Sequence, residues 1–318
     1  EPVTFQSGFG AGVVLNEIGT AKCSGDFSGT DGSEYGDWEA NLESSPLAAA
    51  QMCYGGADDC AQEGGANCQR GIALTPDPDD TSNQVLHTWI AEPAENISDP
   101  DDVACSGEDG LDAIGSRKAR AQLTIDPESS LASLNYSVRI RLGDGFNSLN
   151  DELGLPINWM TIGEFWNQGE MVIDKGDRAR VTLNLVKESA EDPFHFGLKG
   201  DYQPDGESGW SHLWAQDALV SSEVVPIGTW FTLEVSLTAG DASSGRVVVS
   251  YTPDGGTSVP LFDVSDATIY PDSQVPGFTS FQPIKLYTEG SYVCWLKTLD
   301  QTLDAHWDDL ILSVTDSP

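Results

Sequence analysis

The stretch "NYSVRIRLG" at residues 135–143 decides the fold, because apolar and polar side chains alternate along it. Successive side chains of a β-strand point to opposite faces, so its valine, isoleucine and leucine form one apolar face while Arg139 and Arg141 share the other. A helix would instead space its apolar residues three and four apart. The stretch therefore predicts a half-buried strand that presents two arginines on its outer face.

Similar short alternating runs fill most of the chain and are separated by Gly, Asp, Pro and Ser. They lie at residues 12–18, 83–90, 119–125, 159–168, 179–187, 194–200, 230–237, 245–252, 284–289 and 306–314. Only "SPLAAAQM" at residues 45–52 indicates a short helix, with a serine cap and Pro46 in its first turn. The pattern predicts an all-β protein, a two-sheet antiparallel β-sandwich of the jelly-roll type in which residues 1–318 form a single domain.

The chain is strongly acidic, with 15 Lys and Arg against 51 Asp and Glu and a formal net charge of −36. Nucleic acid and anionic membranes would be repelled by this field, so we expect neither as a partner. No run approaches the roughly 20 apolar residues that span a bilayer. For most carboxylates we expect a role in solubility in a salty, marine or halophilic setting, where salt screens their mutual repulsion.

Six cysteines, most of them in Gly- and Asp-rich sequence, favour disulfides in a secreted protein. A zinc site is the alternative, but the chain has no Cys-x-x-Cys pair. Residues 19–82 hold four of the six and show few strand signals, which predicts a loop-rich, disulfide-stapled excursion. The pairing stays open among Cys23, Cys53, Cys60, Cys68, Cys105 and Cys294.

The same alternation assigns outward faces to polar residues of several other predicted strands. The outward set comprises Arg120, Gln122, His195, Lys199, Lys285 and Tyr287, with His87 and Trp89 from residues 83–90. If these strands adjoin in one sheet, they form a basic, hydrogen-bonding groove for an extended anionic chain, with aromatic rings that stack on sugars. The alternative is an ordinary polar outer face, with the strands divided between two sheets.

A second group of candidate functional residues lies in "TIGEFWNQ" at residues 161–168. Glu164 and Trp166 share one face of this stretch, and Asn167 lies on the other. An apolar neighbourhood raises the pKa of a glutamate toward that of a general acid, so Glu164 is a candidate glycosidase carboxylate. Hydrolysis needs a second carboxylate about 5 to 10 Å away, and Asp201 and Glu170 are the nearest candidates. Glu164 could equally pair with an arginine.

The chain resembles concanavalin A-like jelly-roll proteins that act on carbohydrates, and among them polysaccharide lyases of the heparinase I and glucuronan lyase type. The stretches that carry the resemblance are "FQSGFGAGVVL" (5–15), "IGEFWNQ" (162–168), "GTWFTLEVSLTAGDASSGRVVV" (228–249), "PIKLYTE" (283–289) and "HWDDLIL" (306–312). In such lyases a late strand carries a lysine and a tyrosine on one face, commonly with three residues between them. Here Lys285 and Tyr287 keep the shared face with one residue between them.

The resemblance implies β-elimination at a uronic acid, in which cationic or amide groups neutralise the sugar carboxylate. Candidates for this role are Arg139, Arg141, Asn167 and Lys199. The base would be His195 or His87, with Tyr287 as base or acid. The remaining residues expected to bind substrate are Arg120, Gln122, Glu164, Trp166, Lys285 and Trp89.

The last predicted strand contains Asp308 and Asp309, and in the sandwiches that the chain resembles such a pair often helps to bind a structural Ca²⁺. Because adjacent strand residues alternate, only one of the two can point at a given site. Together these observations lead us to expect a secreted, monomeric lyase that cleaves an acidic polysaccharide and needs no catalytic cofactor. The alternatives are a non-catalytic carbohydrate-binding module and a glycoside hydrolase that uses Glu164.

Overall fold

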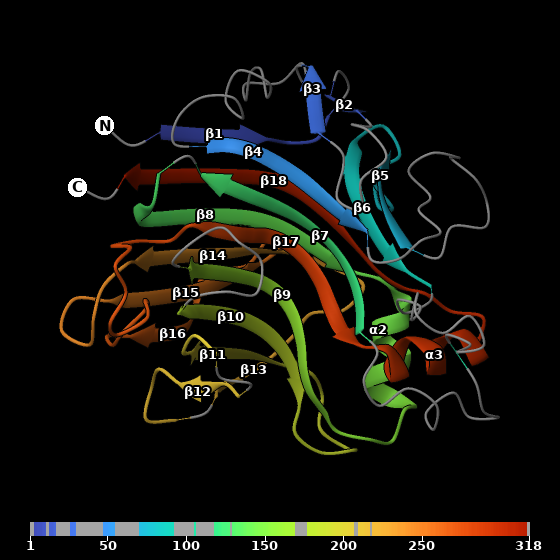
Figure 1. Ribbon diagram of the computed structural model, residues 1–318. Helices are drawn as coiled ribbons and strands as arrows, with labels where there is room; N and C mark the ends of the chain where they lie inside the picture. The colour runs from blue at the N-terminus through green and yellow to red at the C-terminus, as the bar shows by residue number, and fades with distance from the viewer. Residues whose placement is uncertain are drawn as a thin grey trace.

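Two eight-stranded antiparallel sheets dominate the computed structural model (Figure 1). The structure describes residues 3–10, 13–16, 26–29, 47–54, 70–91, 105, 118–127, 129–168, 177–206, 209–216 and 218–316. In sheet 1 the strands lie in the order β16-β15-β14-β8-β18-β6-β5, and β1 also pairs with β18. In sheet 2 the order is β12-β11-β10-β9-β17-β7-β4, and β13 also pairs with β11.

The strands of sheet 1 are β1 (Val3–Ser7), β5 (Arg70–Pro76), β6 (Gln84–Ile90), β8 (Leu131–Leu142), β14 (Trp230–Thr238), β15 (Arg246–Pro253), β16 (Val259–Val264) and β18 (Leu303–Asp316). Those of sheet 2 are β4 (Leu47–Tyr54), β7 (Lys118–Pro127), β9 (Ile157–Gln168), β10 (Arg178–Lys187), β11 (His195–Gln203), β12 (Ser211–His212), β13 (Leu219–Val224) and β17 (Ser280–Glu289). Two further strands, β2 (Val13–Asn16) and β3 (Asp26–Gly29), pair with each other.

The hydrophobic core lies between the two sheets and is built from the apolar faces that the alternation defines. Ile140 and Leu142 of sheet 1 are fully buried, as are Phe165, Ile284 and Leu286 of sheet 2. Truncating a buried phenylalanine such as Phe165 to alanine typically costs about 3 to 5 kcal/mol. The predicted all-β, two-sheet antiparallel sandwich is confirmed.

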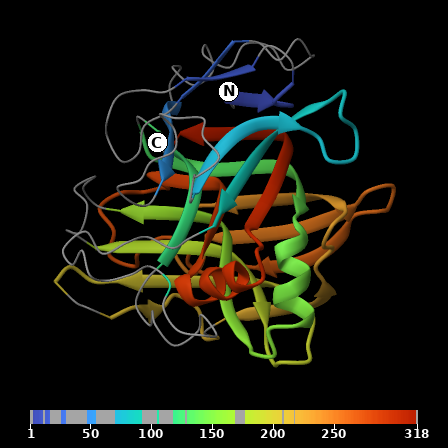
Figure 2. The ribbon, with the colours of Figure 1, turned by 90° about the vertical axis from the view of Figure 1, so that its right-hand side faces the viewer.

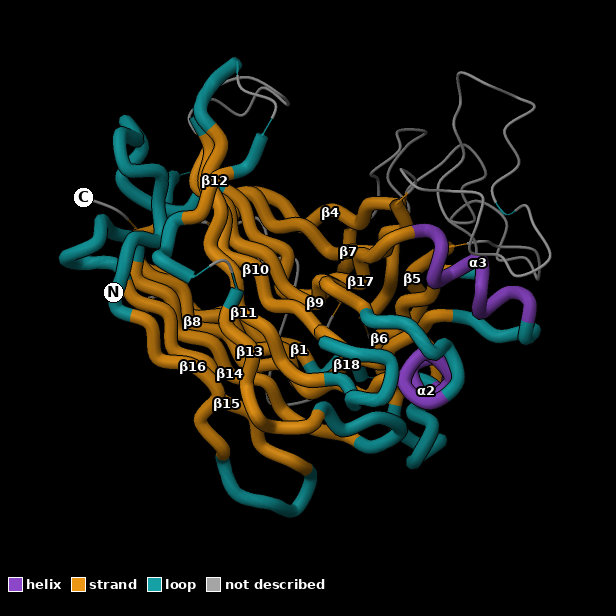
Figure 3. The backbone as a smooth tube through the Cα atoms, turned by 90° about the horizontal axis from the view of Figure 1, so that it is seen from below, coloured by secondary structure: helices purple, strands orange, loops and turns teal. Residues whose placement is uncertain are grey.

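Two helices, neither of which the sequence analysis predicted, lie together at one end of the sandwich (Figures 1, 2 and 3). They are α2 (Asp144–Asp151), which directly follows β8, and α3 (Gly290–Thr298), which directly follows β17. Both are short, and α2 buries Phe146 and Leu149 against the core. None of the helices in the described ranges is long and apolar enough to cross a membrane.

The short helix predicted over residues 45–52 is wrong, because residues 47–54 form strand β4. This strand pairs antiparallel with β7 at the edge of sheet 2. Alanine favours helices by only a few tenths of a kcal/mol per residue, and pairing with a sheet edge outweighs a preference of that size. Strands β3, β4 and β5 all begin within residues 19–82, where the sequence indicates mainly loop.

One disulfide, Cys105–Cys294, is described, with 5.3 Å between its Cα atoms. It anchors residue 105 to helix α3 and agrees with the prediction that the cysteines form disulfides. Cys23, Cys60, Cys68 and the side chain of Cys53 lie outside the described residues.

Candidate active site

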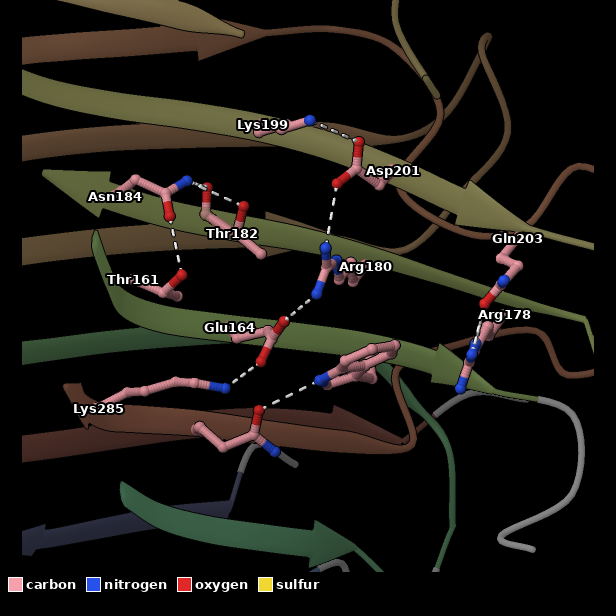
Figure 4. Close-up of polar contacts among 12 residues, drawn as sticks. Thr161, Glu164, Arg178, Arg180, Thr182, Asn184, Lys199, Asp201, Gln203 and Lys285 are labelled. Carbon is pink, nitrogen blue, oxygen red and sulfur yellow. Dashed lines mark hydrogen bonds and ion pairs between the residues drawn. The ribbon is translucent and has the colours of Figure 1, made fainter. Parts of the chain in front are cut away.

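The outer face of sheet 2 gathers polar side chains from four adjacent strands, β11, β10, β9 and β17 (Figure 4). Cross-strand partners share a face, and the register pairs Glu164 with Thr182 and Thr182 in turn with Lys199. Two residues farther along β9, Trp166 pairs with Arg180. The alternation that buries Phe165 and Leu183 therefore directs this polar set away from the core.

A continuous chain of opposite charges crosses these strands (Figure 4). The buried Lys285 ammonium contacts Glu164 Oε2, and Arg180 Nη1 donates to Glu164 Oε1 at 3.0 Å. Arg180 Nη2 lies 3.4 Å from Asp201 Oδ2, and Lys199 Nζ lies 3.4 Å from Asp201 Oδ1. Because each carboxylate is held between two cations, the positions of Arg180 and Lys199 are fixed before any ligand arrives.

The charge states of the central pair follow from burial and Coulomb attraction. The side chains of Glu164 and Lys285 are only 3% and 2% exposed. Burial alone would raise the pKa of Glu164, but Lys285 and Arg180 outweigh it and hold that pKa below its usual value. Burial lowers the pKa of Lys285 to about 8, against the opposing attraction of Glu164. Glu164 is therefore an ionised carboxylate at neutral pH and no reservoir of protons.

A cleft of about 600 Å³ opens on this face. Its polar lining includes Thr161, Arg180, Thr182, Asn184, Lys199, Asp201 and Tyr287. Thr161 Oγ1 donates to Asn184 Oδ1 at 2.9 Å, and Asn184 Nδ2 donates to Thr182 Oγ1 at 3.0 Å. The cleft thus presents fixed amide and hydroxyl groups beside its cations, which suits a polyhydroxylated anion.

Tyr287 is half-buried in this cleft between two cations. The Arg120 guanidinium carbon lies 4.7 Å from the centroid of its ring, and Lys285 Nζ lies 5.0 Å from it. The Trp159 ring packs against the same tyrosine with 5.0 Å between centroids. The Tyr287 ring therefore has two cations and an indole as direct neighbours.

A second aromatic group surrounds Arg180. Its guanidinium carbon lies 4.1 Å from the Trp210 ring centroid and 5.4 Å from that of Trp166. Trp166 Nε1 donates to Gln282 Oε1 at 3.2 Å, which fixes the orientation of the indole. The arginine is thereby clamped by rings as well as by carboxylates.

The structure brings together seven of the residues predicted to form the site. They are Arg120, Gln122, Glu164, Trp166, Lys199, Lys285 and Tyr287, all on the outer face of sheet 2. The prediction that Glu164 could pair with an arginine is confirmed by its contact with Arg180. Asn167 is fully buried instead, and its amide holds the backbone oxygens of Val275 and Gly277. Its assignment to the sugar carboxylate is therefore wrong.

Four other predicted residues lie on the outer face of sheet 1, so the expectation of one shared groove is wrong for them. They are Arg139 and Arg141 on β8, and His87 and Trp89 on β6. Arg139 Nη2 donates to Asp254 at 2.9 Å, and Arg141 Nε donates to Asp79 at 3.2 Å. Alternation along a strand fixes the face of a side chain, but it does not say which sheet the strand joins.

His195 has the outward face that the sequence predicts, and strand β13 pairs with this part of β11. Its Nδ1 lies 3.1 Å from the carbonyl oxygen of Glu223, and His195 is not among the described residues that line the cleft. This position does not fit the predicted role of a base. We expect His195→Ala to retain more than about half of any lyase activity, as measured by initial rates at saturating substrate. A loss of about a hundredfold, the scale of general-base catalysis, would restore His195 as a candidate.

Arg180, Thr161, Thr182 and Asn184 line the cleft as well, although none of them was assigned to it from the sequence. The alternation gives a signal for Arg180, Thr182 and Asn184, whereas Thr161 joins this face through a register shift between β9 and β10. In "ARVTLNLVK" (179–187), valine and leucine alternate with Arg180, Thr182 and Asn184, as they do in the strands that were used. Asp201 was considered only as a second carboxylate for a hydrolase. Its contacts with Arg180 and Lys199 instead make it a residue that positions cations.

The pair Asp308 and Asp309, for which we expect calcium, lies on β18 in sheet 1. Asp308 Oδ2 accepts a hydrogen bond from Asn83 Nδ2 at 3.1 Å and lies 3.8 Å from Arg139 Nη1. Within the described ranges, neither aspartate belongs to a group of three or more side chains that could jointly hold a metal ion. Calcium binding by this pair stays a prediction.

Asp308 gives a pH-dependent prediction of its own. Burial and the neighbouring Asp309 raise its pKa to about 7 from 3.8, so the folded state binds the proton more tightly. Stability contributed by this proton is present at low pH and is lost as the pH rises toward about 7. Asp308→Asn is uncharged at every pH, and Asn83 can turn its amide to keep a hydrogen bond with it.

We therefore expect the melting temperature of Asp308→Asn to exceed that of the unsubstituted protein by more at about pH 8 than at about pH 5. Thermal unfolding in a chelating buffer measures this difference. An equal difference in melting temperature at both pH values would contradict the raised pKa of Asp308. Added Ca²⁺ that raises the melting temperature of the unsubstituted protein alone would support the calcium prediction.

Comparisons with known proteins identify similar structures but no similar sequence. No family model and no curated protein match the chain. An alginate lyase mutant in complex with alginate tetrasaccharide is 11% identical, with a TM-score of 0.49, and the match covers 98% of this chain and 96% of that one. A marine alginate lyase from Aplysia kurodai is 12% identical, with a TM-score of 0.46 and coverage of 76% and 86%.

An endo-β-1,4-glucuronan lyase from Trichoderma reesei is 10% identical, with a TM-score of 0.46 and coverage of 78% and 89%. The solved structures to which this chain is similar thus include lyases of the kind that its sequence resembles. At these sequence identities the similarity concerns the fold alone.

Proposed function

We propose that the chain is a secreted lyase that cleaves an anionic, uronate-containing polysaccharide by β-elimination in the cleft of sheet 2. The observation that carries this proposal is the position of Tyr287. It is an acid–base group that lies between two cations and lines a cleft which also presents Arg180 and Lys199. The molecule has a net charge of −36, so a cluster of cations gives this region a charge opposite to that of the whole protein. The Cys105–Cys294 disulfide supports an extracellular setting.

Recognition of the substrate rests on the fixed cations and amides. A uronate carboxylate that enters the cleft meets Lys199 and Arg180, each held by Asp201. Neutralising this carboxylate makes the adjacent C5 proton more acidic, because the carbanion that forms beside it is stabilised. Thr182 and Asn184 supply hydrogen bonds to sugar hydroxyls from the same strand.

The elimination itself needs one proton to leave C5 and one to reach the departing oxygen. The Tyr287 phenolate takes the C5 proton, and the electron pair of that C–H bond forms the C4–C5 double bond. The C4–O bond then breaks, and the leaving oxygen takes up the proton that Tyr287 now carries.

A hydrolase that uses Glu164 as its acid is poorly supported. Such an enzyme needs a carboxyl group that is protonated at its working pH. Glu164 instead has a lowered pKa, is almost fully buried and shares its two oxygens between Lys285 and Arg180. A binding module without catalysis fits the cations and rings of the cleft, but it leaves the placement of Tyr287 without a use.

One experiment separates these three functions. The protein is incubated with uronate-containing and neutral polysaccharides while ultraviolet absorbance of the unsaturated product and new reducing ends are followed together. We expect both signals to rise with a uronate polymer and neither with a neutral one. Reducing ends without absorbance would indicate a hydrolase, and binding without either signal would indicate a module. Both results would overturn the proposal.

A further inference from the structure

The outer face of sheet 1, on the other side of the sandwich from the cleft, carries a cluster of two histidines and an aspartate. His87 lies on β6, and Asp304 and His306 lie two residues apart on the adjacent strand β18. The register places His306 directly opposite His87. All three side chains therefore share one face, and none of them takes part in the proposed elimination.

The potential ligand atoms of the cluster already lie close together. His87 Nε2 is 3.3 Å from Asp304 Oδ2, and His306 Nδ1 is 4.0 Å from the same oxygen. Ligands about 2.0 to 2.2 Å from one ion in a tetrahedral arrangement lie roughly 3 to 3.5 Å apart. One of the two distances from Asp304 meets this spacing, and the other requires a shift of less than about 1 Å.

His306 Nδ1 gives an independent sign that a ligand is missing. Its side chain is 12% exposed, and this nitrogen is buried without a hydrogen-bond partner in the part of the chain that the structure describes. Buried polar atoms in folded proteins almost always have a partner, such as a protein group, water or an ion.

The aromatic rings of the cluster are packed against one another. The ring of His87 stacks on His306 with 4.4 Å between centroids and 10° between planes, and on Trp89 with 5.3 Å, so one imidazole has to turn for both nitrogens to point at the same ion. The Asp304 carboxylate lies against Gly143, where a Cβ atom would come within 2.1 Å of Oδ1. Arg141 is the nearby cation, and its charge is opposed by Asp79 at 3.2 Å. Asp79 therefore offsets the positive charge that Arg141 would bring close to a bound divalent ion.

We propose that His87, Asp304 and His306 form a binding site for one divalent transition-metal ion such as Zn²⁺. The ligand atoms are His87 Nε2, Asp304 Oδ2 and His306 Nδ1. Two imidazoles and a carboxylate suit borderline ions such as Zn²⁺, Ni²⁺ and Cu²⁺ better than they suit Ca²⁺, which takes oxygen ligands. Three protein ligands leave at least one coordination position for water. The site is separate from the cleft of sheet 2 and does not depend on the function proposed for it.

Calorimetric titration of chelator-treated full-length protein with Zn²⁺ tests the site directly. We expect one ion per chain and a melting temperature that rises with Zn²⁺ concentration. Asp304→Asn, which keeps the size of the side chain, is expected to weaken binding by about tenfold or more, and so is His306→Ala. Titration with Co²⁺ provides a second readout, since ligation by the cluster changes the visible absorption of the ion.

The matched control is His195→Ala, which removes a strand histidine that lies outside the cluster. It is expected to bind Zn²⁺ as the unsubstituted protein does. Circular dichroism shows whether each variant folds. If His306→Ala does not fold, Zn²⁺ binding by Asp304→Asn decides whether the cluster is the site. Substoichiometric binding, or binding that Asp304→Asn leaves unchanged, would overturn the proposal and leave the cluster as a polar surface patch.

Discussion

Tyr287→Phe is expected to reduce kcat for elimination by about 10²- to 10⁴-fold, the range that a positioned acid–base group contributes. The substitution removes only the phenolic oxygen, so the ring keeps its contacts with Trp159 and Arg120. Substrate affinity is set by cations and amides elsewhere in the cleft, and we expect it to change by less than about threefold. Initial rates over a range of uronate polymer concentrations measure kcat and KM separately.

Tyr202→Phe is the matched control for this prediction. Tyr202 lies on β11 and packs against the Tyr270 ring, with 5.7 Å between centroids, and it does not line the cleft. It loses the same atom and should retain the activity of the unsubstituted protein. If Tyr287→Phe were equally active, the assignment of Tyr287 as acid and base would be wrong, even if the protein is a lyase.

Glu164→Gln is expected to lower the free energy of unfolding by about 3 kcal/mol, because it leaves the buried Lys285 without its counter-charge. The loss is limited, since the pKa of Lys285 is already lowered to about 8 and the unpaired amine can shed its proton. The same substitution removes one of the two carboxylates that hold Arg180, so the cation that meets the substrate is held less firmly by Asp201 and the rings alone. We therefore expect weaker substrate binding in addition to lower stability.

Urea unfolding of Glu164→Gln, Lys285→Met and the double variant measures this interaction. The double variant should be more stable than the sum of the two single losses implies, because it leaves no unpaired charge. The exposed pair Arg246 and Asp263, whose side chains are 55% and 57% exposed, provides the control. Asp263→Asn is expected to leave stability unchanged within error. Equal effects of Glu164→Gln and Asp263→Asn would show that burial does not strengthen the Glu164 pair.

The sequence predicts this protein well wherever strand alternation alone decides the outcome. Alternation assigned the correct outward face to Arg120, Glu164 and Lys199, because each has a neighbour in the chain that is buried in the core, such as Ala121, Phe165 and Leu198. It also indicated that Lys285 and Tyr287 share a face. The same logic applied to residues 179–187 assigns an outward face to Arg180, Thr182 and Asn184.

What alternation cannot supply is the partner of each strand. Residues 83–90 and 135–143 have the same pattern as 119–125 and 284–289, yet the first two join sheet 1 and the last two join sheet 2. This choice depends on chain connections and on packing between distant segments. His87 and Arg139 were therefore assigned to the cleft from patterns that are equally good on either side of the sandwich.

The sequence also misses elements whose stability comes mainly from tertiary contacts. Strand β4 is rich in alanine, and the edge of sheet 2 determines its conformation. Helix α2 spans eight residues, too few to be stable alone, and is held by the burial of Phe146 and Leu149. Neither β4 nor α2 has a local sequence signal strong enough to predict it without knowledge of the tertiary packing.

The connection from β17 through α3 to β18 has a consequence for how the molecule is made. These are the last two strands of the chain, yet β17 lies between β9 and β7 in one sheet and β18 between β8 and β6 in the other. Translation must therefore reach residue 289 before sheet 2 can close and residue 316 before sheet 1 can close. Until then the growing chain exposes unpaired strand edges, which in most proteins invite aggregation. We expect the net charge of −36 to keep neighbouring chains apart during that interval.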